Sequence, residues 1–208
     1  KLLNKLGIKK KLFSLHDYNE DVLIKKIEKY QAVSAIAIIS DAGSPLISDP
    51  GYGLVQNYIS KKLMVTTIPG PSSIISALQL SGIPINNFLF HGFVPKNKKN
   101  ISEIVLKINE FDMASVFFIS GKRLLYFLRE ISTKGIDRKI SVCKEMTKKN
   151  EFVFRGEADV IINKISSNEN YLKGEFVVII QGKENKNHNF LSFENENVIK
   201  KLLKKYSL

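Results

Sequence analysis

The chain has 208 residues, of which 44% are hydrophobic and 25% are charged, a balance typical of a globular protein. This composition excludes a globally disordered or collagen-like chain, and no apolar run reaches the roughly 18 residues that a membrane-spanning helix requires. Lysine and arginine outnumber aspartate and glutamate by 32 to 20, which gives a net charge of +12. This excess favours a polyanionic partner such as nucleic acid, although a composition rich in Lys and Asn produces the same charge without one.

Residues that commonly bind metals are few and scattered. Cys143 is the single cysteine, which excludes an internal disulfide and a multi-cysteine zinc site. His16, His91 and His188 are far apart in the sequence, so we expect no metal site. A cysteine that ends an apolar strand is more often buried and unreactive than reactive, so we expect Cys143 to lie inert in the core. The N-terminus does not resemble a signal peptide, and we expect a cytoplasmic protein.

In the first part of the chain, amphipathic segments alternate with short apolar runs. Helical spacing of apolar residues predicts helices over 21–30, 54–60 and from Ser72 or Ser73 to about Ser81. The apolar runs predict two strands, Ala35–Ile39 and Leu63–Ile68, and the first has the composition of a central parallel strand. Each predicted strand is followed by a loop rich in glycine and proline.

The second part repeats this alternation. The predicted strands are 88–90, 114–120, 139–143, 152–154 and 176–181, and the predicted helices are 101–110, 121–131 and 158–165. Strands alternating with helices predict an α/β fold with two blocks of parallel-type strands. We therefore expect an N-terminal domain over 1–87, a C-terminal domain over 88–183, and a polar linker with a basic tail over 184–208.

Ligands of such folds bind in the loops at the carboxyl ends of the strands. In the loop 41–53, Gly43 and Gly51 allow the backbone to approach a ligand without a Cβ clash. The loop matches neither the dinucleotide fingerprint, nor the P-loop, nor a nucleophile elbow around Ser44. The turn 69–73, PGPSS, precedes a helix whose free N–H groups suit an anionic group, or it is an ordinary capped helix start. Together the two loops predict a cleft for a small, nucleotide-like molecule.

Charged residues supply further candidates. Asp41 is either a base or a turn former, whereas Asp49, before Pro50-Gly51, is more typical of a turn. Basic side chains are concentrated in loops of the second block, where they form either a phosphate-binding face or a solvated surface. The basic residues that we expect to contact RNA are Lys96, Lys98, Lys99, Arg123, Lys144 and Arg155.

The segments SDAGSPLISDPGYGLV, TIPGPSSIISAL and SGIP closely resemble the tetrapyrrole methylase superfamily and, within it, the enzymes that methylate small-subunit ribosomal RNA. LHDYNE, HGFVPK, KEMTK and KGEFVVIIQG fit the same family in the same order, so the resemblance extends from about Leu2 to Gly182. It implies two α/β domains with a cofactor cleft between them, and a homodimer. It also implies methyl transfer from S-adenosylmethionine to the ribose 2′-hydroxyl of a cytidine in 16S rRNA, free or in the 30S particle.

The resemblance also implies the residues that contact the cofactor. They are Ala42, Gly43, Ser44 and Ile47 in the first loop, Ser72 and Ser73 in the turn, and Ser120 and Met146 in the second domain. A ribose hydroxyl is a poor nucleophile, so a nearby general base would accelerate the reaction, and Asp41 is our candidate.

Two departures from the family pattern leave alternatives open. The family begins with a strand, a Pro-Ile-Gly-Asn loop and a Glu-Asp-Thr-Arg segment, which this sequence lacks, so we expect a chain that is incomplete at its N-terminus. The family's Tyr-Glu-Ser or Phe-Glu-Ser turn is here Phe118-Ile-Ser-Gly121, without the acidic residue. The alternatives are methylation of a corrin or sirohaem precursor, and an inactive RNA-binding remnant.

Overall fold

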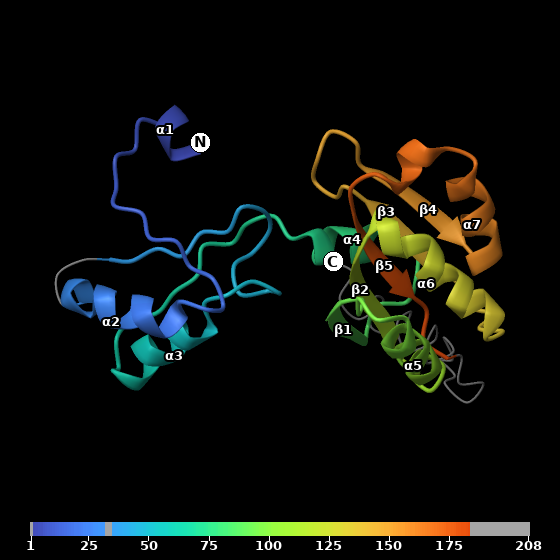
Figure 1. The fold of residues 1–208 in the computed structure, drawn as a ribbon, viewed down its shortest axis with the longest axis horizontal. Coiled ribbons are helices and arrows are strands. Elements are labelled where there is room, and N and C mark those ends of the chain that lie inside the picture. Colours follow the sequence, from blue (N-terminus) through green and yellow to red (C-terminus); the bar gives the residue numbers. More distant parts are fainter. Residues whose placement is uncertain (1, 32–34, 184–208) are drawn as a thin grey trace, which may run out of the picture. The chain divides into compact units, whose positions relative to one another are not determined.

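The computed structural model describes residues 2–31 and 35–183 (Figure 1). Its contacts divide the chain into two compact units, unit 1 (Lys1–Ser76) and unit 2 (Ala77–Leu208). The domain limits 1–87 and 88–183 stay a prediction, and the polar segment 184–208 lies outside the described residues. Within the described part, no helix is both long and apolar enough to cross a membrane.

Unit 1 is mainly helical. It contains α1 (Leu2–Lys5), α2 (Glu20–Gln31) and α3 (Tyr52–Ser60), and α4 (Ser73–Ser81) begins at its end. A small core forms where Leu23 and Ile27 of α2 meet Leu54 of α3. The carboxylate of Glu20 accepts a hydrogen bond from the backbone N–H of Leu54 at 2.8 Å, which fixes the start of α3 against α2.

The prediction of strands over 35–39 and 63–68 is wrong. Both segments are irregular, and no strand pairing occurs among the described residues of unit 1. Met64 and Ile68 are 90% and 91% exposed, so the second segment has no apolar layer to cover it. A strand requires a neighbour for its backbone N–H and C=O groups, and an apolar composition alone does not supply one.

Unit 2 contains a five-stranded sheet and four further helical segments. The strands are β1 (Phe88–Phe93), β2 (Ala114–Ser120), β3 (Ile140–Lys144), β4 (Phe152–Gly156) and β5 (Glu175–Ile180). The helices are α5 (Lys98–Ile108), α6 (Gly121–Thr133), α7 (Ala158–Ser166) and the 3-10 helix η1 (Glu169–Leu172). These elements confirm the predicted strands and helices of the second block to within a few residues.

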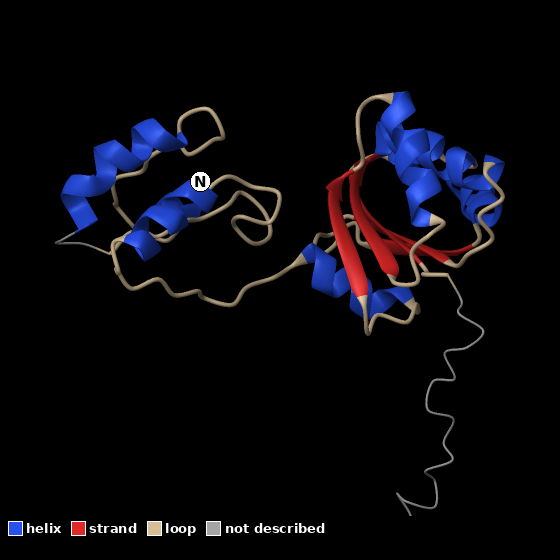
Figure 2. Ribbon diagram, turned by 90° about the horizontal axis from the view of Figure 1, so that it is seen from below, coloured by secondary structure: helices blue, strands red, loops and turns tan. Residues whose placement is uncertain are grey.

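The sheet order is β1-β2-β5-β3-β4, and the expectation of parallel-type strands is wrong for most of it. Only β1 and β2 pair in parallel, across the α5 crossover, whereas β5 inserts antiparallel between β2 and β3, and β4 pairs antiparallel with β3. The loop from β3 to β4 is too short for the crossover that a parallel pair needs. Figure 2 shows this twisted sheet with helices on both of its faces.

Side chains alternate between two apolar faces of the sheet, as expected for strands covered on both sides. One face joins α5, α6 and α7 in a core that includes the fully buried Phe117, Phe127 and Val178. On the other face, Cys143 lies against the carbonyl of Ala77 in α4, with its sulfur 3.9 Å from the oxygen. The thiol is buried, and burial raises its pKa, so the prediction of an inert core cysteine is confirmed.

Candidate functional site

The loop between residues 40 and 53 of unit 1 has an unusual backbone. Gly43 and Gly51 have φ angles of 71° and 129°, and the non-glycine residues Leu46 and Ser48 have φ angles of 69° and 63°. A positive φ at a branched residue such as Leu46 costs free energy, and such strain is concentrated at ligand-binding loops. The sequence indicated the glycines of this loop, but not the strained residues between them.

The backbone of this loop is open to a ligand. Within the described residues, Ser40 Oγ donates to the carbonyl of Gly43 at 3.1 Å, and no other hydrogen bond reaches residues 41–49. Five predicted site residues lie in this loop. The exposed ones are Asp41, Ala42, Gly43 and Ile47, and Ser44 is partly buried. A Cβ at Gly43 would meet no atom within 4 Å. The loop therefore offers backbone N–H donors without a protein partner beside the exposed side chain of Ile47.

The second predicted loop leads into α4. Ser72 is the cap: its carbonyl accepts from Ser76 N at 3.0 Å, and its Oγ lies 3.5 Å from Ile75 N. Ser73 is the first residue of the helix, so the predicted helix start is confirmed. Pro69, Gly70 and Pro71 are exposed. A weak cap of this kind leaves the remaining N–H groups of the first turn available to a ligand.

In unit 2, the sheet brings the carboxyl ends of three strands to one edge. Ser120 at the end of β2 pairs with Glu175, and Lys144 at the end of β3 pairs with Phe176, on opposite sides of the first residues of β5. Since β1 is parallel to β2, its last residue Phe93 lies at the same edge. The loops that follow β1, β2 and β3 therefore share one edge of the sheet, although the strand between β2 and β3 is antiparallel.

Ser120 and Arg123 lie together at this edge. The guanidinium of Arg123 donates to Ser120 Oγ at 3.3 Å through Nε and to the carbonyl of Val94 through Nη1. Arg123 is thereby half-buried and joins the loop after β1 to the start of α6. The Nε and Nη1 groups of Arg123 therefore have a structural role.

Met146 is buried, in a loop that is both strained and held by charge. Glu145 and Thr147, on either side of it, have φ angles of 48° and 65°. The carboxylate of Glu145 accepts from Glu175 N at 2.8 Å and from Lys148 Nζ at 3.3 Å. The backbone N–H of Glu175 is the main cause that lowers the pKa of Glu145, and the Lys148 ammonium adds to it. A charge-assisted network thus positions Met146.

The other predicted RNA contacts are distributed unevenly. Lys96 and Lys99 are exposed in or beside the loop after β1, and Lys98 Nζ lies 5.3 Å from the ring centroid of Tyr126. At the end of β3, Lys144 Nζ donates to the carbonyl of Asn170 at 2.6 Å. Arg155 is elsewhere: it pairs with Ser141 near the opposite end of the sheet and donates to the carbonyl of Leu80 through Nε at 2.9 Å.

An aromatic cluster close to this edge was not predicted. Phe152 and Phe154 of β4 lie against Tyr171 of η1. The signal in the sequence is weak, because FVFR contains only two aromatic residues and one basic residue, and Tyr171 lies far from it along the chain. Within the described residues, no group of His, Cys, Asp and Glu side chains is arranged to hold a metal ion.

Comparison with known proteins places the chain in a family. The solved methyltransferase CobJ has the same fold, with a TM-score of 0.53 over 76% of this chain and 70% of that one, at 11% sequence identity. The model of the tetrapyrrole (corrin/porphyrin) methylases matches residues 5–161, which include both glycine- and proline-rich loops.

Individual relatives show to which branch of this family the chain belongs. Ribosomal RNA small subunit methyltransferase I of Thermotoga maritima is 39% identical over 88% of this chain and 82% of its own length. The proteins with that name from Xylella fastidiosa and Escherichia coli O157:H7 are 37% and 35% identical over 87% of this chain, which spans 67% and 64% of their lengths. The chain belongs to the ribosomal RNA small subunit methyltransferase I branch of the tetrapyrrole methylase family.

Proposed function

We propose that the protein transfers a methyl group from S-adenosylmethionine to the ribose 2′-hydroxyl of a cytidine in small-subunit ribosomal RNA. The observation that carries this proposal is the 39% identity over 88% of the chain to a protein named for methylation of that RNA. The net charge of +12 and the basic loops at one edge of unit 2 support an RNA substrate. We further propose that the protein acts in the cytoplasm as a homodimer.

The loop 41–53 and the turn 69–73 are the proposed cofactor site in unit 1. When bound, S-adenosylmethionine supplies an electrophilic methyl group on a sulfonium. The free N–H groups of Ala42, Gly43 and Ser44 would hold its polar groups, and Ile47 would cover its apolar surface. Ser72 and Ser73 would bind it at the start of α4. In unit 2, Ser120 and the buried Met146 are the further proposed cofactor contacts.

Asp41 is the proposed base for the 2′-hydroxyl. Its carboxylate is exposed at the start of the strained loop, where a ribose can approach it. Accepting the hydroxyl proton as the new C–O bond forms would contribute about 10²–10⁴-fold in rate. The remaining task of the protein is to hold donor and acceptor in line, which lowers the barrier by several kcal/mol.

The proposal is tested by incubating the full chain with methyl-labelled S-adenosylmethionine and 30S particles or 16S rRNA. We expect label in RNA, on the ribose of a cytidine after nuclease digestion and mass spectrometry. Asp41→Asn should lower kcat by at least 10²-fold. Asp49→Asn, in the same exposed loop, should retain most of the activity and serves as the matched control.

Three results would contradict the proposal. Label on a base would exclude ribose methylation. Label on a corrin or sirohaem precursor but not on RNA would favour tetrapyrrole chemistry, and RNA binding without any S-adenosylmethionine binding would identify an inactive remnant. Equal losses in Asp41→Asn and Asp49→Asn would remove Asp41 as the base.

A further inference from the structure

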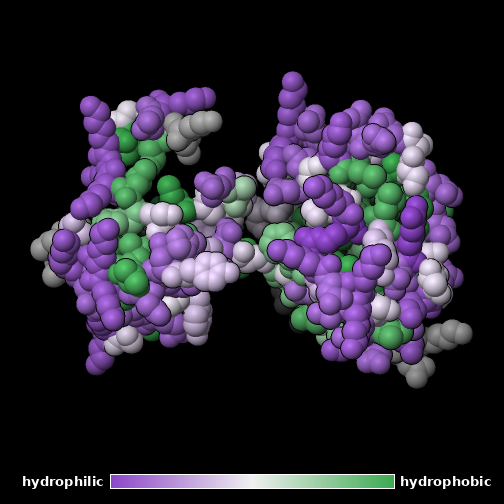
Figure 3. Space-filling view, in the orientation of Figure 1, coloured by the Kyte–Doolittle hydropathy of each residue, from purple (hydrophilic) through white to green (hydrophobic). Residues whose placement is uncertain are grey.

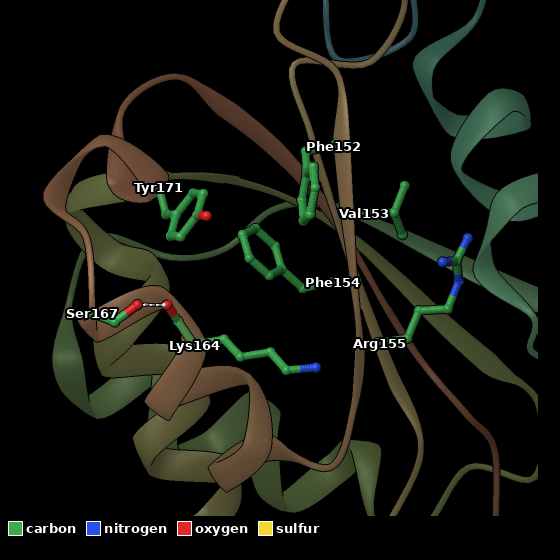
Figure 4. Close-up of a pocket in the computed structure, with 7 residues that line it drawn as sticks. All are labelled: Phe152, Val153, Phe154, Arg155, Lys164, Ser167 and Tyr171. Carbon is green, nitrogen blue, oxygen red and sulfur yellow. Dashed lines mark hydrogen bonds between the residues drawn. The ribbon is translucent and has the colours of Figure 1, made fainter.

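A cavity of about 300 Å³ lies in unit 2 between β4, α7 and η1 (Figure 4). Phe152, Phe154 and Tyr171 form one side of it, and Lys164 of α7 extends along another. In Figure 3, apolar surface reaches the exterior over β3 and β4, within a rim of hydrophilic residues. This volume is at the lower limit for ligand pockets, and it suits one planar ring system better than a tetrapyrrole.

The three aromatic rings hold one another in place. The ring centroids of Phe152 and Phe154 are 4.8 Å apart, and those of Phe154 and Tyr171 are 5.2 Å apart in an edge-to-face contact. Phe154 is 4% exposed and belongs to the core, whereas Phe152 is 50% exposed. The ring of Tyr171 also lies nearly parallel to that of Phe152, with the centroids 6.1 Å apart. A ring that is held by its neighbours and half exposed can stack on an unpaired nucleobase.

The charge of the cavity is positive. Lys164 and Arg155 line it, and no acidic residue does. Arg155 points away toward α4, where its guanidinium binds the carbonyl of Leu80. Among the described residues, the ammonium of Lys164 has no hydrogen-bond or ion-pair partner. A lysine of this kind beside a stacking ring fits the phosphate of the nucleotide whose base is stacked.

The cavity is continuous with the edge of unit 2 that carries the basic loops. Phe152 pairs with Lys144 in the sheet, and Lys144 Nζ binds the carbonyl of Asn170, the residue before Tyr171. We propose that this cavity binds one unpaired nucleotide of the RNA substrate, with the base on Phe152 and the phosphate at Lys164. This subsite rests on the proposed function, but it lies outside the residues assigned to methyl transfer.

The affinity of the full chain for a fluorescent single-stranded RNA of small-subunit sequence tests the subsite. Phe152→Ala should weaken binding about 5- to 20-fold, and Phe152→Trp should restore it. Phe88→Ala is the matched control, because Phe88 is 41% exposed on the other edge strand, β1, and its loss should change affinity less than twofold. Lys164→Gln should reduce the slope of log K against log salt by about one, and Lys107→Gln on α5 should not.

Photocrosslinking gives a second readout. RNA carrying 5-iodouridine should crosslink to the peptide that contains Phe152 or Tyr171. Equal RNA affinity of the wild type, Phe152→Ala and Phe88→Ala, or crosslinks confined to other peptides, would overturn the subsite while methyl transfer to RNA stays intact. Absence of methyl transfer by the wild type would instead contradict the proposed function, and the affinity series would still decide whether the cavity binds RNA.

Discussion

Units 1 and 2 contain apolar segments of similar composition, but only unit 2 converts them into a sheet. In unit 2, all five strands pair, and twenty buried residues form one core. In the described part of unit 1, three buried residues form the core, and the apolar segments 35–39 and 63–68 stay unpaired. The difference shows that an apolar run becomes a strand only where a neighbouring strand and a covering layer are present.

Truncation of a large side chain should give the largest difference in stability loss between the two units. Phe117 is fully buried and lies between His91 and Phe127, with ring centroids at 4.4 and 5.4 Å. Phe117→Ala should lower the free energy of unfolding of unit 2 by about 3–5 kcal/mol. Met64→Ala, at a site that is 90% exposed in unit 1, should change stability by less than about 0.5 kcal/mol.

Urea unfolding followed by circular dichroism measures both changes. Similar losses in Phe117→Ala and Met64→Ala would show that Met64 is covered in solution. Unit 1 would then be packed rather than open around residue 64.

Substitution of one glycine in each unit should give a smaller difference in stability. A Cβ at Gly121 would lie 1.5 Å from the carbonyl oxygen of Leu172, whereas a Cβ at Gly70 would meet no atom within 4 Å. Gly121→Ala must displace η1 from α6 and should cost about 1–3 kcal/mol. Gly70→Ala should leave the thermal midpoint within about 1 °C of the wild type. A larger loss in Gly70→Ala would mean that the turn 69–73 is packed rather than open.

The smallest effect concerns pH and is confined to unit 2. The pKa of Glu145 is lowered in the fold, so its contribution to stability is present above the unfolded pKa of about 4.3 and is lost as the pH falls through the folded pKa. Glu145→Gln should remove about 1 kcal/mol at pH 6. The variant should also show a shallower decrease in stability between pH 5 and pH 3.

Unfolding free energies measured at intervals of half a pH unit test this dependence. Parallel curves for the wild type and Glu145→Gln would show that the carboxylate of Glu145 is not held by Glu175 N and Lys148. The buried position of Met146 would then need another explanation.

The sequence predicted the elements of unit 2 well because their signals are local. Ala114–Ser120 is confirmed residue for residue, and the helices after it have clear apolar periodicity. The insertion of β5 between β2 and β3 was not predicted, because strand order depends on contacts between residues far apart in the sequence. The same reason explains why Tyr171 was not grouped with Phe152.

The candidate site was predicted to a different extent in each unit. The glycines and prolines of 41–53 and 69–73 indicated open loops, and the structure shows free backbone donors in the first loop. In unit 2, strand pairing brings Ser120, Lys144 and Phe93 to one edge, and the sequence indicated the first two but not Phe93. The structural contacts of Arg123 and Arg155 could not be predicted, because their partners, Val94 and Leu80, are brought near them only by folding.

Hydrogen–deuterium exchange of the full chain with and without S-adenosylmethionine tests the central claim, that the two broken loops of unit 1 bind the methyl donor. We expect slower exchange of the amides of 41–49 and of the first turn of α4 when the donor is present, with little change in β1 and α5. If calorimetry shows that the donor binds but these amides exchange at unchanged rates, the donor site lies elsewhere and the account is contradicted.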